Sequence, residues 1–402
     1  MGGLVIVGAA LAGLRAVEAA RRAGYEGPIT LLGAEKHVPY DRPPLSKAYL
    51  TDGAPVDYYR EERAIREGLD VDLRLGVTAE GLDTTVKTVR TDAGEVPYDR
   101  LIIATGAFPR VLPGIPDLDG IVTLRTADDA ELLRSRIAEG AHVVVLGAGF
   151  VGSEIASSAR HLGAHVTIAE AAEAPLVRAL GPVVGAALAQ LHPRNGTRLL
   201  LATRITEYLG TDRIQSVRLS TGETVAADLV VIGIGAAPAT AWLAGSGVEL
   251  HPDDGGVVCD EQLRTSAPDV FAAGDVVHWP NAALGRTMRL ENWTNAADQG
   301  ARAGVNAAVP ARAQAHTTVP YFWSDWYGKR IQFVGTAEAE AVEFVSGGPK
   351  DDRFVALFRS GDHLVGAATL DEPRRIMKLR RLIADGASYT AGVDFVTAAA
   401  AV

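Results

Sequence analysis

Cysteine is almost absent from this sequence. Cys259 is the single cysteine among 402 residues, so no intrachain disulfide can form. Small extracellular scaffolds that depend on disulfides are therefore excluded, and this composition is typical of a protein in a reducing cytoplasm. We predict a cytoplasmic location and interpret Cys259 as a buried structural thiol.

An excess of positive charge is also lacking. Lysine and arginine total 39 against 49 acidic residues, which gives a formal net charge of −10. The sequence therefore has no overall basic footprint of the kind that binds nucleic acid, and we expect no nucleic-acid partner.

Long apolar runs are missing as well. The longest, from Leu229 to Gly245, is interrupted by glycines and a proline, which favours a buried strand and turn over a membrane helix. The N-terminus passes directly into a predicted strand, without the basic segment and cleavage site of a signal peptide. We expect neither membrane insertion nor a targeting peptide.

What the sequence does contain is the composition of an ordinary globular protein, with 48% hydrophobic and 22% charged residues. A chain of this length can form two or three domains of about 100 to 200 residues each.

The first organising stretch runs from Leu4 to Glu35. A predicted strand at 4–7 leads into a turn of small residues, an alanine-rich helix and a second strand at 29–32. Small residues let backbone N–H groups and the helix N-terminus approach a pyrophosphate, while an acid after the second strand accepts a ribose hydroxyl. The pattern predicts a dinucleotide site with Glu35 as the acid. A plain packing turn is the alternative, because Ala10 replaces the second glycine of the fingerprint.

A cleaner version of this pattern runs from His142 to Glu170. Its turn, residues 147–152, is a complete GxGxxG that follows an apolar strand, and Glu170 ends the next strand 21 residues after Gly149. A carboxylate there accepts from a free ribose 2′-OH and repels a 2′-phosphate. We therefore expect NADH to be favoured over NADPH; the alternative is an exposed acid at a strand end.

Other segments mark the organisation of the chain. The proline-rich residues 37–50 predict a rigid loop, and residues 101–106 predict a buried strand that ends in a small turn. Prolines at 109–116 favour a crossing between domains. Residues 228–235 and 270–275 are two further strands with small turns.

The composition changes from Pro320, where aromatic residues cluster and a third domain is expected. Its last clear element is a basic helix, with Ile376, Leu379 and Ile383 on one face.

Three segments together resemble one protein family. They are PYDRPPLSKAYL at 39–50, ENWTNAADQG at 291–300 and PYFWSDWYG at 320–328. With the two nucleotide units, they are similar to the NADH-dependent ferredoxin reductases of the FAD-containing glutathione-reductase superfamily, which serve class I cytochromes P450 and aromatic-ring oxygenases.

The resemblance implies an α/β fold with two Rossmann-like nucleotide-binding domains, for FAD and NAD, and an α+β C-terminal interface domain. It places the discontinuous FAD-binding domain at 1–109 and 241–319. The NAD-binding domain would occupy 110–240 and the interface domain 320–402.

The resemblance also implies site residues. For FAD these are Gly8, Ala12, Gly13, Glu35, Arg42, Lys47, Ala79, Thr105, Gly106, Arg125, Asp275 and Trp293. For NADH they are Gly147, Gly149, Phe150, Val151, Gly152, Glu154, Glu170, Gly233, Ile234 and Gly235. No metal ligands are expected.

Three of these residues are expected in the catalytic site. Lys47 offers a cation near the negative charge of the reduced flavin, Glu154 pairs with this lysine, and Trp293 lies against the flavin ring. The alternatives are two unrelated surface charges and a tryptophan of the core. For Arg125 and Asp275, the alternatives are a surface ion pair and a helix cap.

The sequence departs from the family pattern at four positions. Ala10 replaces a frequent glycine, Ala34 a frequent ribose-binding acid, Ala239 a common asparagine and Trp326 a usual glutamine. We expect Glu35 to take over from position 34. The change at Trp326 weakens inferences from the family about partner docking.

The function that the resemblance implies is hydride transfer from NADH to FAD and delivery of single electrons to an iron–sulfur ferredoxin, which supplies a cytochrome P450 or ring-hydroxylating oxygenase. Related disulfide reductases need two redox cysteines, and flavin peroxidases need one in the early loop, where residues 40–47 contain none. An NADH:quinone reductase or an NADH-responsive flavoprotein sensor are the alternatives. The basic helix at 374–381 suits a membrane surface, an acidic ferredoxin or solvent. A monomer is expected.

Overall fold

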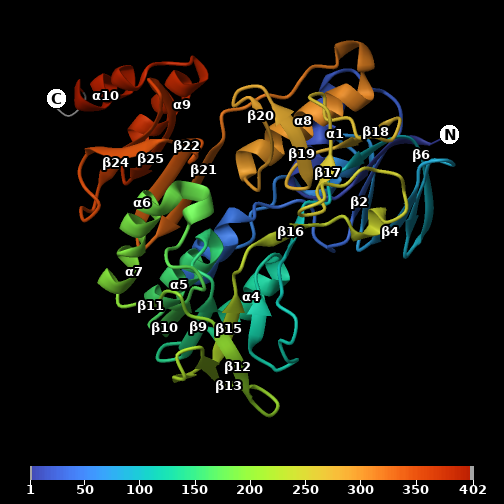
Figure 1. Cartoon of the computed structure of the whole chain (residues 1–402). Helices are drawn as coiled ribbons and strands as arrows, with labels where there is room; N and C mark the ends of the chain where they lie inside the picture. The colour runs from blue at the N-terminus through green and yellow to red at the C-terminus, as the bar shows by residue number, and fades with distance from the viewer. Residues whose placement is uncertain (1, 399–402) are drawn as a thin grey trace. The chain divides into compact units, whose positions relative to one another are not determined.

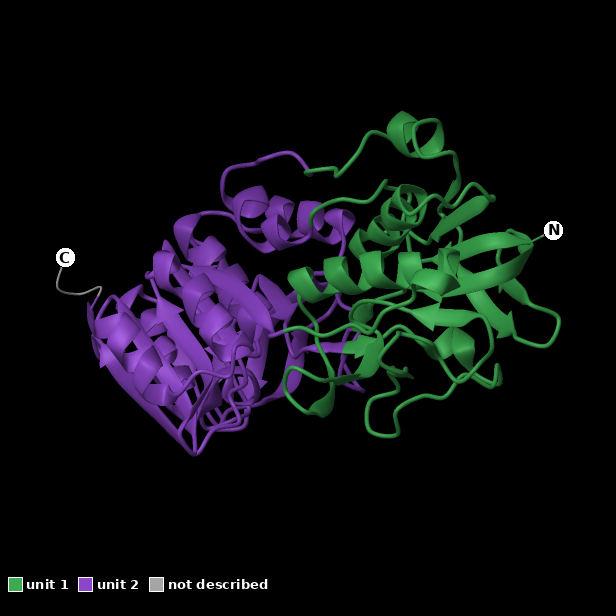
Figure 2. Ribbon diagram, turned by 90° about the horizontal axis from the view of Figure 1, so that it is seen from above, with its two compact units in different colours: residues 1–41, 57–108, 237–318 green, residues 42–56, 109–236, 319–402 purple. Residues whose placement is uncertain are grey.

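The computed structural model describes residues 2–398. Two compact units divide the chain (Figure 2). Unit 1, drawn in green, consists of Met1–Asp41, Asp57–Phe108 and Ala237–Thr318. Unit 2, in purple, consists of Arg42–Val56, Pro109–Ala236 and Val319–Val402. Residues 42–56 belong with unit 2 rather than with the segments that flank them. The finer division into three domains stays a prediction.

Unit 1 is built on a seven-stranded sheet in the order β3-β2-β1-β6-β5-β4, with β18 paired to β6 (Figure 1). The parallel strands are β1 (Gly3–Val7), β2 (Ile29–Gly33), β3 (Val71–Leu75), β6 (Gly94–Ile103) and β18 (Val270–Ala272). The hairpin of β4 (Ala79–Asp83) and β5 (Thr88–Thr91) joins β6 in antiparallel fashion. Apolar runs at β1 and at the end of β6 are buried, as expected for central parallel strands.

Helices α1 (Leu11–Arg22) and α8 (Trp293–Ala308) pack closely in unit 1. A Cβ atom built on Gly300 or Gly304 of α8 would overlap the carbonyl oxygen of Ala12 or Ala16. The two helices therefore meet backbone to backbone, which fixes the start of α1 against unit 1. A small sheet of β17 (Val257–Val258), β19 (Val277–Asn281) and β20 (Arg286–Arg289) completes this unit, together with α3 (Glu62–Arg66).

Unit 2 contains a second parallel sheet, in the order β11-β10-β9-β15-β8. Its strands are β8 (Ile121–Thr123), β9 (His142–Leu146), β10 (His165–Ala169), β11 (Arg198–Leu200) and β15 (Leu229–Ile232). The associated helices are α4 (Ala127–Arg136), α5 (Phe150–His161), α6 (Val177–Ala189) and α7 (Leu191–Arg194). Helix α4 begins with a capping box between Thr126 and Asp129. An antiparallel sheet of β12 (Ile205–Gly210), β13 (Ile214–Leu219) and β14 (Thr224–Ala226) follows.

The C-terminal part of unit 2 is an antiparallel sheet in the order β21-β22-β25-β24-β23. Its strands are β21 (Tyr321–Trp326), β22 (Lys329–Gly335), β23 (Ala341–Ser346), β24 (Phe354–Ser360) and β25 (His363–Leu370). Helices α9 (Pro373–Ala384) and α10 (Tyr389–Ala398) follow, and Ile376, Leu379 and Ile383 of α9 are buried as predicted. Two Rossmann-like sheets and a C-terminal sheet domain confirm the predicted fold class.

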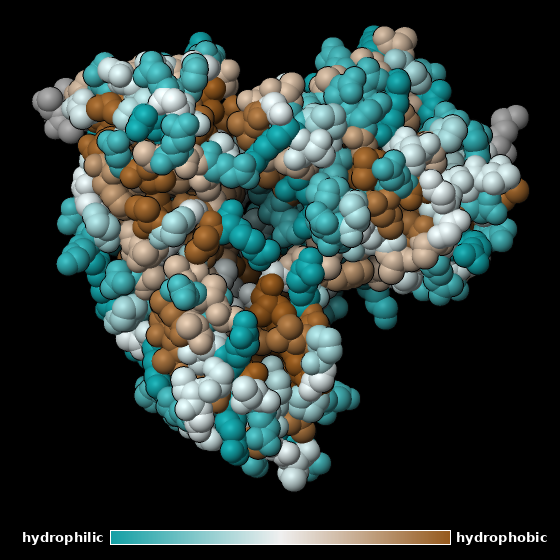
Figure 3. Space-filling model, viewed as in Figure 1, coloured by the Kyte–Doolittle hydropathy of each residue, from teal (hydrophilic) through white to brown (hydrophobic). Residues whose placement is uncertain are grey.

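Two short strands carry the chain across the unit boundary. They are β7 (Ala107–Pro109) and β16 (Ala236–Pro238), and they pair with each other. The side chain of Phe108 is largely exposed here. On the face seen in Figure 3, apolar residues lie in separate patches divided by polar ones. Among residues 2–398, no helix has both the length and the apolar character that a membrane crossing requires.

Candidate active site

The turn after β1 has the geometry of a phosphate-binding turn. Gly8 has φ +122°, and a Cβ atom there would overlap the carbonyl oxygen of Ala104. A Cβ atom on Gly13 would overlap the carbonyl oxygen of Gly8, so both positions require glycine. Helix α1 begins after Ala10, which provides no side-chain cap. Its first N–H groups are thus left for an anion, and the turn fits the pyrophosphate of FAD.

The acid predicted for the ribose lies just beyond β2. Glu35 is half-buried and accepts a hydrogen bond of 2.5 Å from the hydroxyl of Tyr40, whereas Ala34 is exposed. Gly33, at the end of β2, lies against Ala9 of the turn. The structure therefore brings the end of β2 and the glycine turn together.

The small turn after β6 contacts the segment that returns from unit 2. Thr105 Oγ1 donates to the carbonyl oxygen of Ala239 over 2.8 Å, and the Ala239 N–H donates to the Gly106 carbonyl over 2.9 Å. Ala239, a departure from the family, therefore acts here through its backbone. Ala79 begins β4 and pairs with Thr91.

Trp293 is anchored by polar groups on its indole. The indole Nε1–H lies 2.8 Å from Asp41 Oδ1 and 2.9 Å from the Tyr59 hydroxyl, which itself donates to Asp41 over 2.7 Å. Burial and the Asp41 carboxylate raise the pKa of Tyr59 above its usual value. Neither Asp41 nor Tyr59 was predicted from the sequence. A fixed, half-buried indole is suited to a planar ligand.

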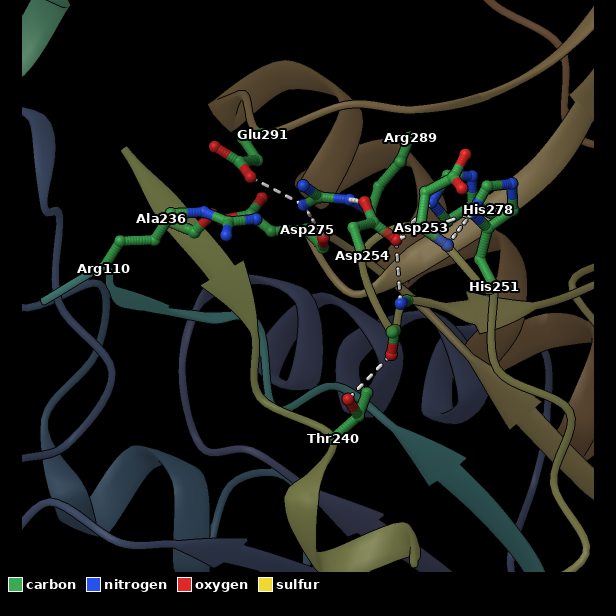
Figure 4. Close-up of polar contacts among 12 residues, drawn as sticks. Arg110, Ala236, Thr240, His251, Asp253, Asp254, Asp275, His278, Arg289 and Glu291 are labelled. Atoms are coloured by element: carbon green, nitrogen blue, oxygen red, sulfur yellow. Dashed lines mark hydrogen bonds and ion pairs between the residues drawn. The ribbon is translucent and has the colours of Figure 1, made fainter. Parts of the chain in front are cut away.

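Asp275 is held through its backbone carbonyl by a half-buried charge network (Figure 4). Arg289 Nη1 donates to the Asp275 carbonyl over 2.8 Å, and its Nε donates to Asp254 Oδ2 over 2.7 Å. Glu291 pairs with the same guanidinium at 2.7 Å. Burial alone would raise the pKa of Asp254, but the Gly256 N–H, Arg289 and His278 together lower it to about 2. The network fixes the loop after β18, where the Asp275 side chain is expected to meet the ribityl chain.

The second glycine turn, in unit 2, has the clearer geometry of a nucleotide-binding turn. Gly147 has φ +98°, and a Cβ atom there would lie 2.5 Å from the Gly233 carbonyl oxygen. A Cβ atom on Gly152 would overlap the carbonyl oxygen of Gly147. At Gly149, in contrast, the nearest atom to such a Cβ would be 3.8 Å away. Gly147 and Gly152 are thus required for packing, while the space beside Gly149 is left for a ligand, as expected for a dinucleotide.

Glu170 closes this turn. Its Oε2 accepts from the Ala148 N–H and its Oε1 from the Ala172 N–H, both over 2.8 Å. The carboxylate therefore lies at the glycine turn and is held in place by backbone groups. Each carboxylate oxygen has a further lone pair for a ribose hydroxyl. Gly233, Ile234 and Gly235 follow β15 beside the turn, and the Gly233 carbonyl faces Gly147.

Phe150 and Val151 begin helix α5 but face different surroundings. The ring of Phe150 packs against Phe322 with centroids 4.8 Å apart, and Val151 is exposed. Phe150 therefore ties the nucleotide turn to the C-terminal sheet.

Lys47 and Glu154, from the proline-rich loop and α5, meet inside unit 2. Lys47 Nζ lies 2.7 Å from Glu154 Oε2, so the two residues form an ion pair. Ser46 and Ser324 each donate to the same carboxylate. Sequence reasoning missed both serines; the place of Ser46 next to Lys47 was the only available signal.

The two predicted arginines also come together. Arg42 Nη1 donates to the Arg125 carbonyl over 2.6 Å, and the Arg125 N–H donates to Asp129 at the start of α4. Cys259, in contrast, is buried, and burial raises the pKa of its thiol. It has the surroundings of a structural cysteine.

Comparison with known proteins agrees with this geometry. The family model described as pyridine nucleotide-disulphide oxidoreductase matches residues 3–300, and the model described as reductase C-terminal matches residues 321–395. Rhodocoxin reductase of Rhodococcus erythropolis is 36% identical over 390 residues, which are 95% of this chain and 89% of that protein.

Two further similarities extend this result. The ferredoxin–NAD(+) reductase component of the anthranilate 1,2-dioxygenase system of Burkholderia cepacia is 37% identical over 391 residues, covering 95% of this chain and 94% of that protein. The crystal structure of the covalent putidaredoxin reductase–putidaredoxin complex superposes with a TM-score of 0.92 at 28% identity, covering 99% of this chain and 98% of that chain.

The chain belongs to the pyridine nucleotide-disulphide oxidoreductase family. It is an oxidoreductase that uses FAD and NAD(H). Several relatives that match over nearly the whole chain are ferredoxin reductases of oxygenase systems, which confirms the resemblance.

Proposed function

We propose that this enzyme takes hydride from NADH and passes single electrons to an iron–sulfur ferredoxin that supplies a cytochrome P450 or ring-hydroxylating oxygenase. One observation carries the proposal: the chain has two glycine turns with the geometry of dinucleotide sites, while its single cysteine is buried. Without a redox-active cysteine pair, electrons from the nucleotide have to leave through an external acceptor. The relatives named as ferredoxin–NAD(+) reductase components support a ferredoxin as that acceptor.

The residues would divide the work between the two sites. The turn at Gly147–Gly152 and Glu170 would bind NADH, and the turn at Gly8–Gly13, with Glu35, would bind FAD. When bound, FAD supplies the conversion of a two-electron donor into single-electron steps, which side chains cannot perform. Lys47, held by Glu154, would compensate negative charge on the reduced flavin, and Trp293 would support its ring.

The partner surface is expected to include helix α9. Arg374, Lys378 and Arg381 are exposed on this helix, although the chain as a whole is acidic. A local positive surface would steer an acidic ferredoxin, with a rate that falls as salt screens the attraction. The buried position of Trp326 removes it from any such surface. We also propose that the protein is cytoplasmic and monomeric.

Steady-state NADH oxidation by the FAD-loaded protein tests the proposal, with cytochrome c as the final acceptor. The assay compares no addition, a panel of [2Fe–2S] and [3Fe–4S] ferredoxins, and a soluble quinone. A rate that requires a ferredoxin and falls with salt is expected. Rapid quinone reduction without ferredoxin dependence would overturn the proposal in favour of a quinone reductase. Slow turnover with every acceptor would favour a sensor.

A further inference from the structure

The carboxylate of Glu154 is held by three donors from two segments of unit 2, the 42–56 loop and strand β21. Its Oε1 accepts from Ser324 Oγ over 2.5 Å. Its Oε2 accepts from Ser46 Oγ over 2.5 Å and lies 2.7 Å from Lys47 Nζ. The Glu154 side chain is only 6% exposed, so water contributes little to holding it. The two serine hydroxyls therefore set the orientation of the Glu154 carboxylate relative to Lys47.

The direction of the Ser324 hydrogen bond is fixed by a neighbour on the same strand. The indole of Trp326 donates to Ser324 Oγ over 2.8 Å. An indole N–H is a donor only, so Ser324 has to use its oxygen as acceptor there and its own hydrogen toward Glu154. The hydrogen bonds thus have one fixed direction: Trp326 donates to Ser324, and Ser324 donates to Glu154.

Trp326 is itself rigidly placed. It is fully buried, and its ring stacks on His192 with centroids 5.3 Å apart and 30° between the planes. Ser324 is also completely buried on strand β21. The C-terminal sheet therefore offers a preorganised hydroxyl, which costs little entropy when it holds a carboxylate.

We propose that Ser324 and Trp326 are positioning residues for Lys47: through Glu154, the C-terminal domain sets the place of the lysine that compensates charge on the reduced flavin. This inference rests on the proposed function of Lys47. It assigns to the C-terminal domain a part in the chemistry in addition to any part in partner docking.

The expected effect follows from the geometry. Without the Ser324 hydroxyl, Oε1 of a buried carboxylate loses its donor, and the carboxylate turns to recover a partner. Lys47 follows it, because its ion pair is with the same group. A displacement of about 1 Å at a charge-compensating group is enough to lower a rate by one or two orders of magnitude.

The test uses the FAD-loaded full chain and four variants. Ser324→Ala removes the hydroxyl, Ser324→Thr retains it, and Trp326→Phe removes the indole N–H while keeping an aromatic ring. Ser360→Ala, on β24 of the same sheet, is the matched control. Two quantities are measured: the rate of flavin reduction by NADH in anaerobic stopped flow, and the midpoint potential of the bound flavin by equilibration with a redox dye.

In Ser324→Ala, NADH is expected to reduce the bound flavin about tenfold more slowly than in the original protein. The affinity for NADH should stay within about twofold of the original value. The variant's midpoint potential should fall by about 30 mV, the equivalent of tenfold for a two-electron couple. Ser324→Thr should restore both values, Trp326→Phe should shift them in the same direction by less, and Ser360→Ala should leave them unchanged.

An unchanged midpoint potential in Ser324→Ala would overturn the inference, and so would equal losses in Ser324→Ala and Ser324→Thr, since these would show a packing effect. The potential is set with a chemical reductant and does not depend on NADH. If NADH fails to reduce the original protein, the proposed function fails, while the shift in potential still decides the role of Ser324.

Discussion

Replacing each glycine of the 147–152 turn by alanine should separate binding from folding. Gly149 has φ −73° and ψ −178°, a conformation that alanine adopts freely, and a Cβ atom there would be 3.8 Å from its nearest neighbour. Gly149→Ala should therefore change the free energy of unfolding by less than about 1 kcal/mol. The new methyl would stand where the pyrophosphate approaches.

The cost to binding can be worked from the contacts that are lost. Hydrogen bonds to a charged group contribute about 1.5 to 3 kcal/mol each. Losing one of them weakens NADH binding by about tenfold to a hundredfold. Gly152→Ala should behave differently, because its methyl would overlap the Gly147 carbonyl and destabilise the fold by about 1 to 3 kcal/mol.

Two assays check this pair of variants. Urea unfolding gives the free-energy changes, and calorimetric titration with NAD⁺ gives the dissociation constants. Gly149→Ala should be stable and bind weakly, and Gly152→Ala should be unstable. If Gly149→Ala bound NAD⁺ as tightly as the original protein, this turn would not be the pyrophosphate site.

Three further predictions concern single side chains. Glu170→Ala should lower the preference for NADH over NADPH, measured as a ratio of kcat/KM, by about tenfold; an unchanged ratio would assign cofactor choice elsewhere. Cys259→Ala should leave flavin reduction by NADH unchanged, because the thiol is buried, and a rate lost with the fold intact would contradict this. Because folding depresses the pKa of Asp254 to about 2, its contribution is full above the unfolded value near 4 and is lost as pH falls through the folded value. Asp254→Asn should thus destabilise the protein by roughly 2 kcal/mol at pH 7 and by less toward pH 3 in urea unfolding; a pH-independent difference would refute the assignment.

Local patterns made the nucleotide turns predictable from the sequence. A buried strand, small residues and a helix adjoin in the chain, so spacing alone places Gly147, Gly149 and Gly152 at one turn. The same holds for the buried face of α9, where a period of 3.6 residues is preserved. The position of Glu170 also followed, because parallel neighbouring strands end at the same edge of a sheet.

Contacts between distant segments could not be predicted in this way. Ser46 and Ser324 are 108 and 170 residues away from Glu154 in sequence. Serine has no pattern of its own, and apart from the place of Ser46 next to Lys47, nothing distinguished either residue from a surface hydroxyl. Likewise, nothing in the composition of residues 42–56 indicated that this loop would belong with unit 2 rather than with the unit that precedes it.

That assignment of the loop has a physical consequence for the enzyme. Helix α5 begins immediately after Gly149, in the turn proposed to bind NADH, and carries Glu154 in its second turn. Lys47, on the 42–56 loop, is tied to this helix by the ion pair with Glu154, and the Ser158 hydroxyl donates to the Ser46 carbonyl over 2.7 Å. The proposed nucleotide turn and the proposed charge-compensating lysine therefore both belong to unit 2. If NADH binds at the turn as proposed, a movement of α5 on binding would move Lys47 with it, and the arrival of the hydride donor would be coupled to the placement of the compensating charge.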